Sequence, residues 1–392
     1  MSGAASAPAL RLPPPALDRL DEVTAALAAT AAGYDRSAAF PHAAIQVVHD
    51  AGLLTAGVGP EFGGAGTDFT QLASILLALG KGDPSVALIT AMTLLPHAFQ
   101  QRRRWPEELY ARIVAESAAR PTLLNNARVE PDLGSPARGG LPATLARRTA
   151  NGWSVSGHKR FVTGAEGLSY ILVWAATDEP DPRVGTFVVP AATPGVRVVP
   201  AWQQLGLRAS GSHDVTFTEV EIPEQDVLDL VEYGAKAEQD NLAAGGIHVV
   251  VTALYLGVAR AAQEFVHAFA HERVPANLGR PLATTDRFKQ TAGEIETLLS
   301  TAEQLIFGIA GRLDRGIAVP GTESLAAKVV AVRQVTSAVQ TGLRLLGNPG
   351  LAQANPLERH FRDIQSAGVH APQEDTALQA IGSAVLAAAP RG

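Results

Sequence analysis

The stretch "GWSVSGHKRFVTG" at residues 152–164 decides the fold class of this 392-residue chain. Apolar and polar residues alternate in it between turn-forming glycines, as expected of a strand with one buried face. Similar runs follow, rich in β-branched residues and separated by turn signals: "YILVWAATDEPDPRVGTFVVP" at 170–190, "GVRVVPAW" at 195–202 and "HDVTFTEVEIP" at 213–223. We therefore predict a central antiparallel β-domain at 123–228.

Helical periodicity surrounds this region on both sides. Apolar residues recur at helical spacing in 17–40 and 68–100, which predicts an all-helical N-terminal domain at 1–122. Three long amphipathic segments, at 242–273, 286–316 and 322–347, predict a C-terminal four-helix bundle domain at 229–392. The fold class is then α+β, because an order of helices, strands and helices argues against a doubly wound sheet.

The composition limits the partners and the compartment. A hydrophobic share of 46% fills a core, and a net charge of −6 argues against nucleic acid and membrane surfaces as partners. No uninterrupted apolar run reaches the roughly 18 residues of a membrane span, and the start lacks a signal-peptide pattern, so we expect a cytoplasmic protein. The chain has no cysteine, and its ten histidines form no HExxH pair. We therefore expect no metal site.

The stretch "GVGPEFGGAGTD" at 57–68 holds five glycines but does not predict a nucleotide loop. No spacing in it gives G-x-G-x-x-G or G-x-x-x-x-G-K, and no βαβ pattern surrounds it. We interpret the stretch as a glycine-rich turn between helices.

Six segments in the same order resemble those of the acyl-CoA dehydrogenase superfamily, and the likeness covers about residues 15–389. They are "GLLTAGVGPEFGGAGTD" (52–68), "VEPDLGS" (129–135), "GWSVSGHKRFVTG" (152–164), "LGLRASGSHDVTFTEVEIP" (205–223), "ERVPANLGRPLATTDRFKQ" (272–290), and "GNPG" (347–350) followed by "PLERHFRD" (356–363). The resemblance implies a flavin-dependent oxidoreductase that binds FAD, with FMN as the alternative, and assembles as a homotetramer or a dimer. It also implies a small-molecule substrate, acyl-CoA among the candidates, and either a flavin reductase or an electron-transfer partner.

Several residues suit a flavin. A flavin ring needs a flat apolar platform and hydrogen-bond donors, and Phe161 and Thr163 at the end of a strand can supply them. By resemblance, Phe161 replaces the family's tryptophan and Thr163 keeps its threonine. Ser135 would place a hydroxyl near the phosphate or the ring, and Gly134 would let the backbone approach closely. Ordinary strand and turn packing is the alternative for each of these residues.

Other residues extend the predicted cofactor site. Asn126, with Asn125 before it, either contacts the flavin edge or forms a polar turn. By resemblance, Arg273 binds the pyrophosphate of a neighbouring subunit's FAD; the alternative is a cation that stabilises a helix end. Gly347 lies where the family has Gln-x-x-Gly-Gly-x-Gly, and Val129 stands where the family has threonine. These two departures put the adenine side in doubt and leave FMN open.

The catalytic assignment depends on "GVHAPQEDT" at 368–376. By resemblance, the family's catalytic glutamate falls at Ala371, which cannot take a proton, and His370 precedes it. Glu374 is either a relocated base or, together with Asp375, the acidic start of a helix. Some sulfur oxygenases of the same fold carry His-x-Pro in this segment, as here.

Three functions therefore remain. An imidazole with a pKa near 6.5 suits proton transfer when reduced flavin reacts with oxygen, which favours a monooxygenase with His370 as the proton donor. The alternatives are an acyl-CoA dehydrogenase with Glu374 as base, and a flavin-binding protein without catalysis. A packed loop histidine is the structural alternative for His370. Ser210, Ser212 and His213 either line the substrate entrance or form a turn.

Overall fold

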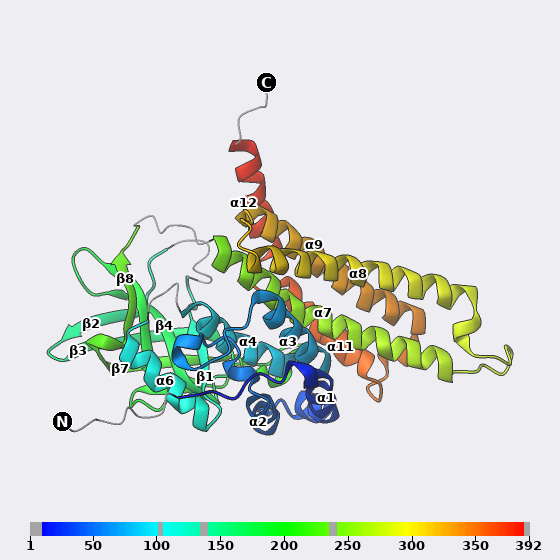
Figure 1. Cartoon of the computed structure of the whole chain (residues 1–392), viewed down its shortest axis with the longest axis horizontal. Helices are drawn as coiled ribbons and strands as arrows, with labels where there is room; N and C mark the ends of the chain where they lie inside the picture. The colour runs from blue at the N-terminus through cyan, green and yellow to red at the C-terminus, as the bar shows by residue number, and fades with distance from the viewer. Residues whose placement is uncertain (1–9, 101–104, 134–139, 235–240, 388–392) are drawn as a thin grey trace, which may run out of the picture.

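The computed structural model describes residues 10–100, 105–133, 140–234 and 241–387. A helical region, a β-sheet and a second helical region follow one another along the chain (Figure 1), which confirms the predicted order. The first region contains α1 (Leu20–Ser37), α2 (His42–Asp50), α3 (Phe69–Gly82), α4 (Pro84–Ala98) and α6 (Glu107–Ala119). Asp68 and Gln71 form a capping box that starts α3 after the glycine-rich stretch.

The glycine-rich stretch is a turn, as predicted. It contains a short 3₁₀ segment at Pro60–Phe62, which ends at Gly63 with φ +80°. The Thr67 hydroxyl donates to the Ala56 carbonyl at 2.6 Å and ties the end of the turn to its beginning. The glycines therefore allow the chain to reverse its direction before α3.

Eight strands form one sheet: β1 (Leu123–Ala127), β2 (Leu145–Thr149), β3 (Gly152–Val162), β4 (Leu168–Thr177), β5 (Arg183–Pro190), β6 (Val196–Val199), β7 (His213–Pro223) and β8 (Val227–Glu232). Seven of them follow the order β6-β7-β3-β2-β4-β5-β8, and β1 pairs with β4. The predicted antiparallel pairing holds for most of the sheet, but β1 and β2 both pair with β4 in parallel. After the β2–β3 hairpin, the chain reverses again and places β4 beside β2 rather than beside β3, so β2 and β4 run in the same direction.

Helix α6 is packed against one part of this sheet. Its buried residues Leu109, Tyr110 and Ile113 form a cluster with Tyr170 of β4 and Val188 of β5. Burial of such large apolar side chains contributes roughly 1.5–3 kcal/mol each. The helix that immediately precedes the sheet in sequence therefore also anchors it in space.

The C-terminal region contains α7 (Asn241–Glu272), α8 (Asp286–Asp314), α9 (Gly321–Leu346), α10 (Asn348–Leu351), α11 (Pro356–Ile364) and α12 (Glu374–Ala387). Helices α7, α8 and α9 pack along one another, and the short α11 lies against α7 and α9. Figure 1 shows α12 projecting from one end of this bundle. Three long helices and a short fourth thus make up the predicted bundle.

Helix α7 joins the two helical regions. A Cβ atom at Gly80 of α3 would lie 2.1 Å from the Leu254 carbonyl oxygen of α7, so only glycine allows this close crossing. The segment Ala244–Glu272 is long and apolar enough to cross a membrane, but 72% of its most apolar window is buried inside the protein. The apolar residues of this segment are therefore those of a core helix that packs against other elements on several sides.

Candidate functional site

Four of the polar residues singled out in the sequence form a hydrogen-bonded network at the end of β3. Asn125 Nδ2 donates to the Thr163 carbonyl oxygen at 2.9 Å, and the hydroxyls of Thr163 and Ser212 lie 3.0 Å apart. Ser212 in turn lies 2.8 Å from the hydroxyl of Ser210, and all four residues are buried. Nδ1 of His213 accepts two backbone N–H bonds from the segment before it, so His213 fixes this turn. The network holds β1, the end of β3 and the turn before β7 together.

Phe161 is an exposed aromatic residue beside this network. Its φ of +56° lies in the left-handed region, which a bulky residue rarely adopts. The register between β3 and β7 shifts here, and Val162 is fully buried while the Phe161 side chain is 47% exposed. Its ring lies 6.4 Å from that of Trp202 and 4.9 Å from the Arg160 guanidinium carbon. An apolar ring held outward in this way fits the platform that a flavin ring requires.

The segment before β2 places the remaining predicted flavin residues. Asn126 is partly buried and follows Asn125 in β1, so its side chain faces the other side of that strand. Gly134 and Ser135 lie outside the described residues. Between them and β1, the Glu130 carboxylate accepts a bond from Lys159 at 2.6 Å inside the core. Glu130 therefore anchors the described start of this motif to the core rather than facing a ligand.

Arg273 and Gly347 belong to the helical bundle, whereas Phe161 belongs to β3 of the sheet. Arg273 is exposed at the turn from α7 to α8, which Figure 1 shows at the end of the bundle remote from the sheet. Gly347 ends α9 with φ +64°, and Leu345 just before it lines a hollow with His267 of α7. Within one chain, the structure does not bring either residue to the flavin candidates.

His370 lies in a buried polar cluster between α11 and α12. Its Nδ1 forms a short hydrogen bond with the Tyr255 hydroxyl of α7. Burial, followed by the nearby Lys328 charge, lowers the pKa of His370 to about 4. Burial raises the pKa of Tyr255 well above 10, so the phenol keeps its proton and donates it to Nδ1. The neutral ring then carries its own proton on Nε2.

The Nε2 atom of His370 is left without a hydrogen-bond partner among the described residues. It forms no hydrogen bond within the described ranges and does not belong to the buried atoms that lack a partner. The expected pKa near 6.5 therefore does not hold in this structure, because enclosure of the ring disfavours its charged form. At neutral pH, His370 offers an N–H donor rather than an imidazolium.

Lys328 of α9 holds the segment that carries His370. Its Nζ donates to the His370 carbonyl at 2.8 Å and to the Pro372 carbonyl at 2.6 Å, on either side of Ala371. Lys328 is 6% exposed and forms no ion pair in the part of the chain that the structure describes. Burial lowers its pKa to about 8. Nearby, His248 Nδ1 lies 3.0 Å from the hydroxyl of Ser324, and burial lowers its pKa to about 4.

Sequence reasoning missed Lys328 and Tyr255. A signal for Lys328 does exist: it is a charged residue among Ser324, Ala327 and Ala331, on the buried side of an amphipathic helix. Tyr255 gave no such signal, because a tyrosine in an apolar helix is ordinarily part of the core.

Glu374 is the first residue of α12 and is exposed. Its carboxylate accepts a bond from Arg333 at 2.6 Å, and this bond lowers the pKa of Glu374. This geometry fits the acidic start of a helix. The assignment of Glu374 as a base stays a prediction, and an ion-paired surface carboxylate counts against it.

The flavin candidates and the His370 cluster are linked through one loop. Trp202, whose ring faces Phe161, donates its indole N–H to the Leu207 carbonyl at 2.9 Å. The Leu207 backbone N–H donates to the Asp363 carboxylate at 2.8 Å, and Asp363 belongs to the helix that leads to His370. The loop therefore contacts both Trp202 beside Phe161 and the helix that precedes His370.

Comparison with known proteins defines the class. Models of the acyl-CoA dehydrogenase N-terminal, middle and C-terminal domains match residues 20–101, 127–220 and 249–374. The chain is 31% identical over 365 residues to "Putative acyl-CoA dehydrogenase YdbM" of Bacillus subtilis (strain 168), a match that covers 92% of this chain and 94% of YdbM. The chain belongs to the acyl-CoA dehydrogenase family, whose members are flavin-dependent oxidoreductases.

Solved structures with bound FMN share this fold. KijD3 in complex with FMN and an amino-keto sugar nucleotide superposes with a TM-score of 0.84 at 27% identity, covering 94% of this chain and 92% of KijD3. FMN-bound TdsC of Paenibacillus sp. A11-2, a dibenzothiophene monooxygenase, superposes with a TM-score of 0.85 at 22% identity, covering 95% and 97%. At that identity, the TdsC match shows the fold alone.

Proposed function

We propose that this chain is a flavin-dependent monooxygenase in which His370 is the hydrogen-bond donor to the reacting oxygen. One observation carries the proposal: Ala371 stands where the resemblance places the catalytic glutamate, while His370 beside it is held by Tyr255 and Lys328. The FMN-bound KijD3 and TdsC structures support it. A desaturase of thioesters needs a base at this place, and alanine cannot serve as one.

The residues of this chain have separable tasks in such a reaction. A bound flavin would supply the electrons that reduce oxygen, and Phe161 and Thr163 would hold its ring. The structure supports His370 as a neutral donor whose Nε2–H orients and polarises the reacting oxygen, with Tyr255 fixing the tautomer. Lys328 keeps the His370 backbone in place.

The decisive experiment is stopped-flow oxidation of the reduced protein. The flavin-loaded protein is reduced without air and mixed with oxygenated buffer while the flavin spectrum is followed. We expect a transient species before the oxidised spectrum returns, and we expect His370→Ala to slow its formation roughly a hundredfold. The matched control is His271→Ala, an exposed histidine of α7. Direct return to oxidised flavin, indifferent to His370→Ala, would refute the proposal.

An acyl-CoA dehydrogenase with Glu374 as base is the second candidate, favoured by the name of the Bacillus relative. It requires that acyl-CoA bleach the oxidised flavin without air and that Glu374→Gln abolish the bleaching. We expect neither result, because Glu374 is exposed and paired with Arg333. An electron-transfer partner would then replace the flavin reductase that the monooxygenase needs. A flavin-binding protein without catalysis would show no redox change with any substrate.

Assembly into a homotetramer or a dimer is part of the proposal. Arg273 and Gly347 lie remote from Phe161 within one chain, so they can complete a cofactor site only if a second copy brings them to it. Sedimentation of the flavin-loaded protein tests this point. A monomeric mass with flavin fully bound would contradict it.

A further inference from the structure

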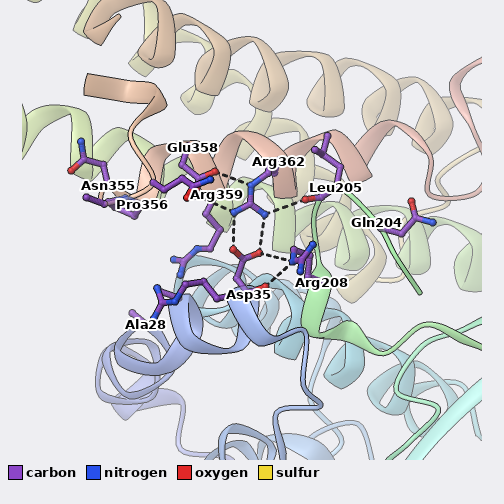
Figure 2. A pocket seen from close by; sticks show the side chains of 14 residues that line it. Ala28, Asp35, Gln204, Leu205, Arg208, Asn355, Pro356, Glu358, Arg359 and Arg362 are labelled. Carbon is purple, nitrogen blue, oxygen red and sulfur yellow. Dashed lines mark hydrogen bonds and ion pairs between the residues drawn. The ribbon is translucent and has the colours of Figure 1, made fainter. Parts of the chain in front are cut away.

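A separate hollow lies between α1 and the start of α11 (Figure 2), outside the residues assigned above. Its volume is about 590 Å³, within the range of small-molecule sites. Residues of α1, of the loop before β7 and of the α10–α11 segment line it. Four of the lining residues are arginines, Arg36, Arg208, Arg359 and Arg362, and two are acids, Asp35 and Glu358.

Two of these arginines are already paired. Arg362 donates from both terminal nitrogens to the Asp35 carboxylate, at 2.8 and 2.7 Å, and from Nε to Glu358 at 2.8 Å. Arg208 donates to the Asp35 backbone carbonyl at 2.7 Å. Figure 2 shows this network as a bridge across the hollow. It fixes the walls and neutralises both acids.

Arg359 is different, because its buried guanidinium has no hydrogen-bonded partner among the described residues. It is 8% exposed, its Nε is sealed from solvent without a hydrogen bond, and the described residues give its guanidinium no ion pair. Two buried acids, Asp83 and Asp363, interact with the Arg359 charge, which opposes the rise in their pKa values that burial causes. Their carboxylates accept backbone N–H bonds from Ser85 and Leu207, and neither forms an ion pair with Arg359 in the described residues. A buried guanidinium without a hydrogen-bonded acceptor is costly, and its two Nη atoms are not among the sealed atoms, so they can take an acceptor from the hollow.

The start of α11 adds donors to the same hollow. Its N-cap residue Asn355 forms no side-chain capping bond, because Asn355 Nδ2 donates to the Pro349 carbonyl. Pro356 has no N–H, so the first turn of this nine-residue helix offers the N–H groups of Leu357 and Glu358, which no side chain caps, to an anion. Arg36 stands across from them on α1, exposed and without a hydrogen bond or ion pair to any described residue.

We propose that this hollow binds the phosphate group of a small molecule, with Arg359, Arg36 and the α11 N-terminus as its donors. A phosphate offers three acceptor oxygens and nearly two negative charges, which match two free guanidinium groups and a helix N-terminus. The hollow is larger than a bare ion requires, so a phosphate monoester fits it better than free phosphate. The site is separate from the flavin candidates and does not depend on the proposed reaction.

Calorimetric titration of the flavin-loaded protein with inorganic phosphate, at constant ionic strength, tests the site. We expect one saturable site per chain, a Kd raised about tenfold or more by Arg359→Met, and a smaller loss in Arg36→Met. Arg147→Met is the matched control, since Arg147 is an exposed arginine paired with Asp178 on the sheet. It should leave the Kd unchanged.

Titration with AMP then separates the sources of the phosphate. Tighter binding of AMP than of phosphate identifies a phosphate monoester of a larger molecule, and equal binding identifies free phosphate. Absence of saturable binding overturns the site, as does a Kd that is equal in wild type and Arg359→Met or that Arg147→Met weakens equally. Should Arg359→Met fail to fold, an unchanged Kd in the surface variant Arg36→Met overturns the site as well.

Discussion

Replacement of Lys328 by methionine should alter how stability depends on pH. Burial lowers the pKa of Lys328 from an ordinary 10.5 to about 8 in the folded protein. Between pH 8 and 10.5, the unfolded chain therefore holds a proton on this residue that the folded chain has lost, and a rise in pH through this window stabilises the folded state. The pKa difference corresponds to about 3 kcal/mol.

Two opposing effects decide the result at neutral pH. Lys328→Met leaves the His370 and Pro372 carbonyls without their donor, and charge-assisted bonds of this kind contribute about 1.5–3 kcal/mol each. It also removes a buried charge, which offsets about 3 kcal/mol of that loss. At pH 10.5, the wild-type amine is neutral and keeps both bonds. The gap in unfolding free energy between wild type and Lys328→Met should thus widen by about 3 kcal/mol from pH 7 to pH 10.5.

Urea unfolding of the flavin-free protein at pH 7 and pH 10.5, followed by tryptophan fluorescence, measures this gap. Lys159, whose pKa burial also lowers to about 8, is present in both proteins and cancels. Lys289→Met is the control, because Lys289 is exposed on α8 and its replacement should give the same small gap at both pH values. A Lys328→Met gap that stays constant within 1 kcal/mol (roughly the error of two extrapolations) would show that the amine is not buried as a charge.

Two further substitutions test the site directly. Tyr255→Phe removes the partner of His370 Nδ1 and should lower kcat about tenfold with little change in KM, because it costs about one hydrogen bond; steady-state turnover measures this. An unchanged kcat would leave Tyr255 as a packing residue. Phe161→Ala should weaken flavin binding by up to about tenfold in a fluorescence titration, whereas Phe161→Trp should retain it, since an aromatic face is worth about 0.5–1.5 kcal/mol. Equal flavin affinity in both Phe161 variants would exclude the ring as the platform.

The order of helices and strands could be read from periodicity, because the alternation in 152–162 and the apolar stripe of α9 depend on local burial alone. The parallel pairing of β4 with β1 and β2 could not be predicted from the sequence. A strand's partner is set by the path of the chain, and both faces of β4 are buried whichever neighbour it takes. The same pattern of residues is therefore compatible with several sheet orders.

The candidate site contains residues of two kinds. Some could be predicted from a sequence motif, and others come together only through the packing of distant helices. His370 could be found because it stands beside the position of a family motif, whereas its partners Tyr255 and Lys328 come from two helices distant in sequence. No local pattern predicts that Lys328 of α9 will donate hydrogen bonds to the carbonyls of His370 and Pro372, some forty residues later in the chain. A methionine at position 328 would fill the same space without burying a charge, which would avoid a free-energy cost of about 3 kcal/mol. Methionine would also leave both carbonyls beside Ala371 unpaired. A buried lysine with no acidic partner is thus best explained by the loop that it holds, and this loop carries the one imidazole that the proposed reaction requires.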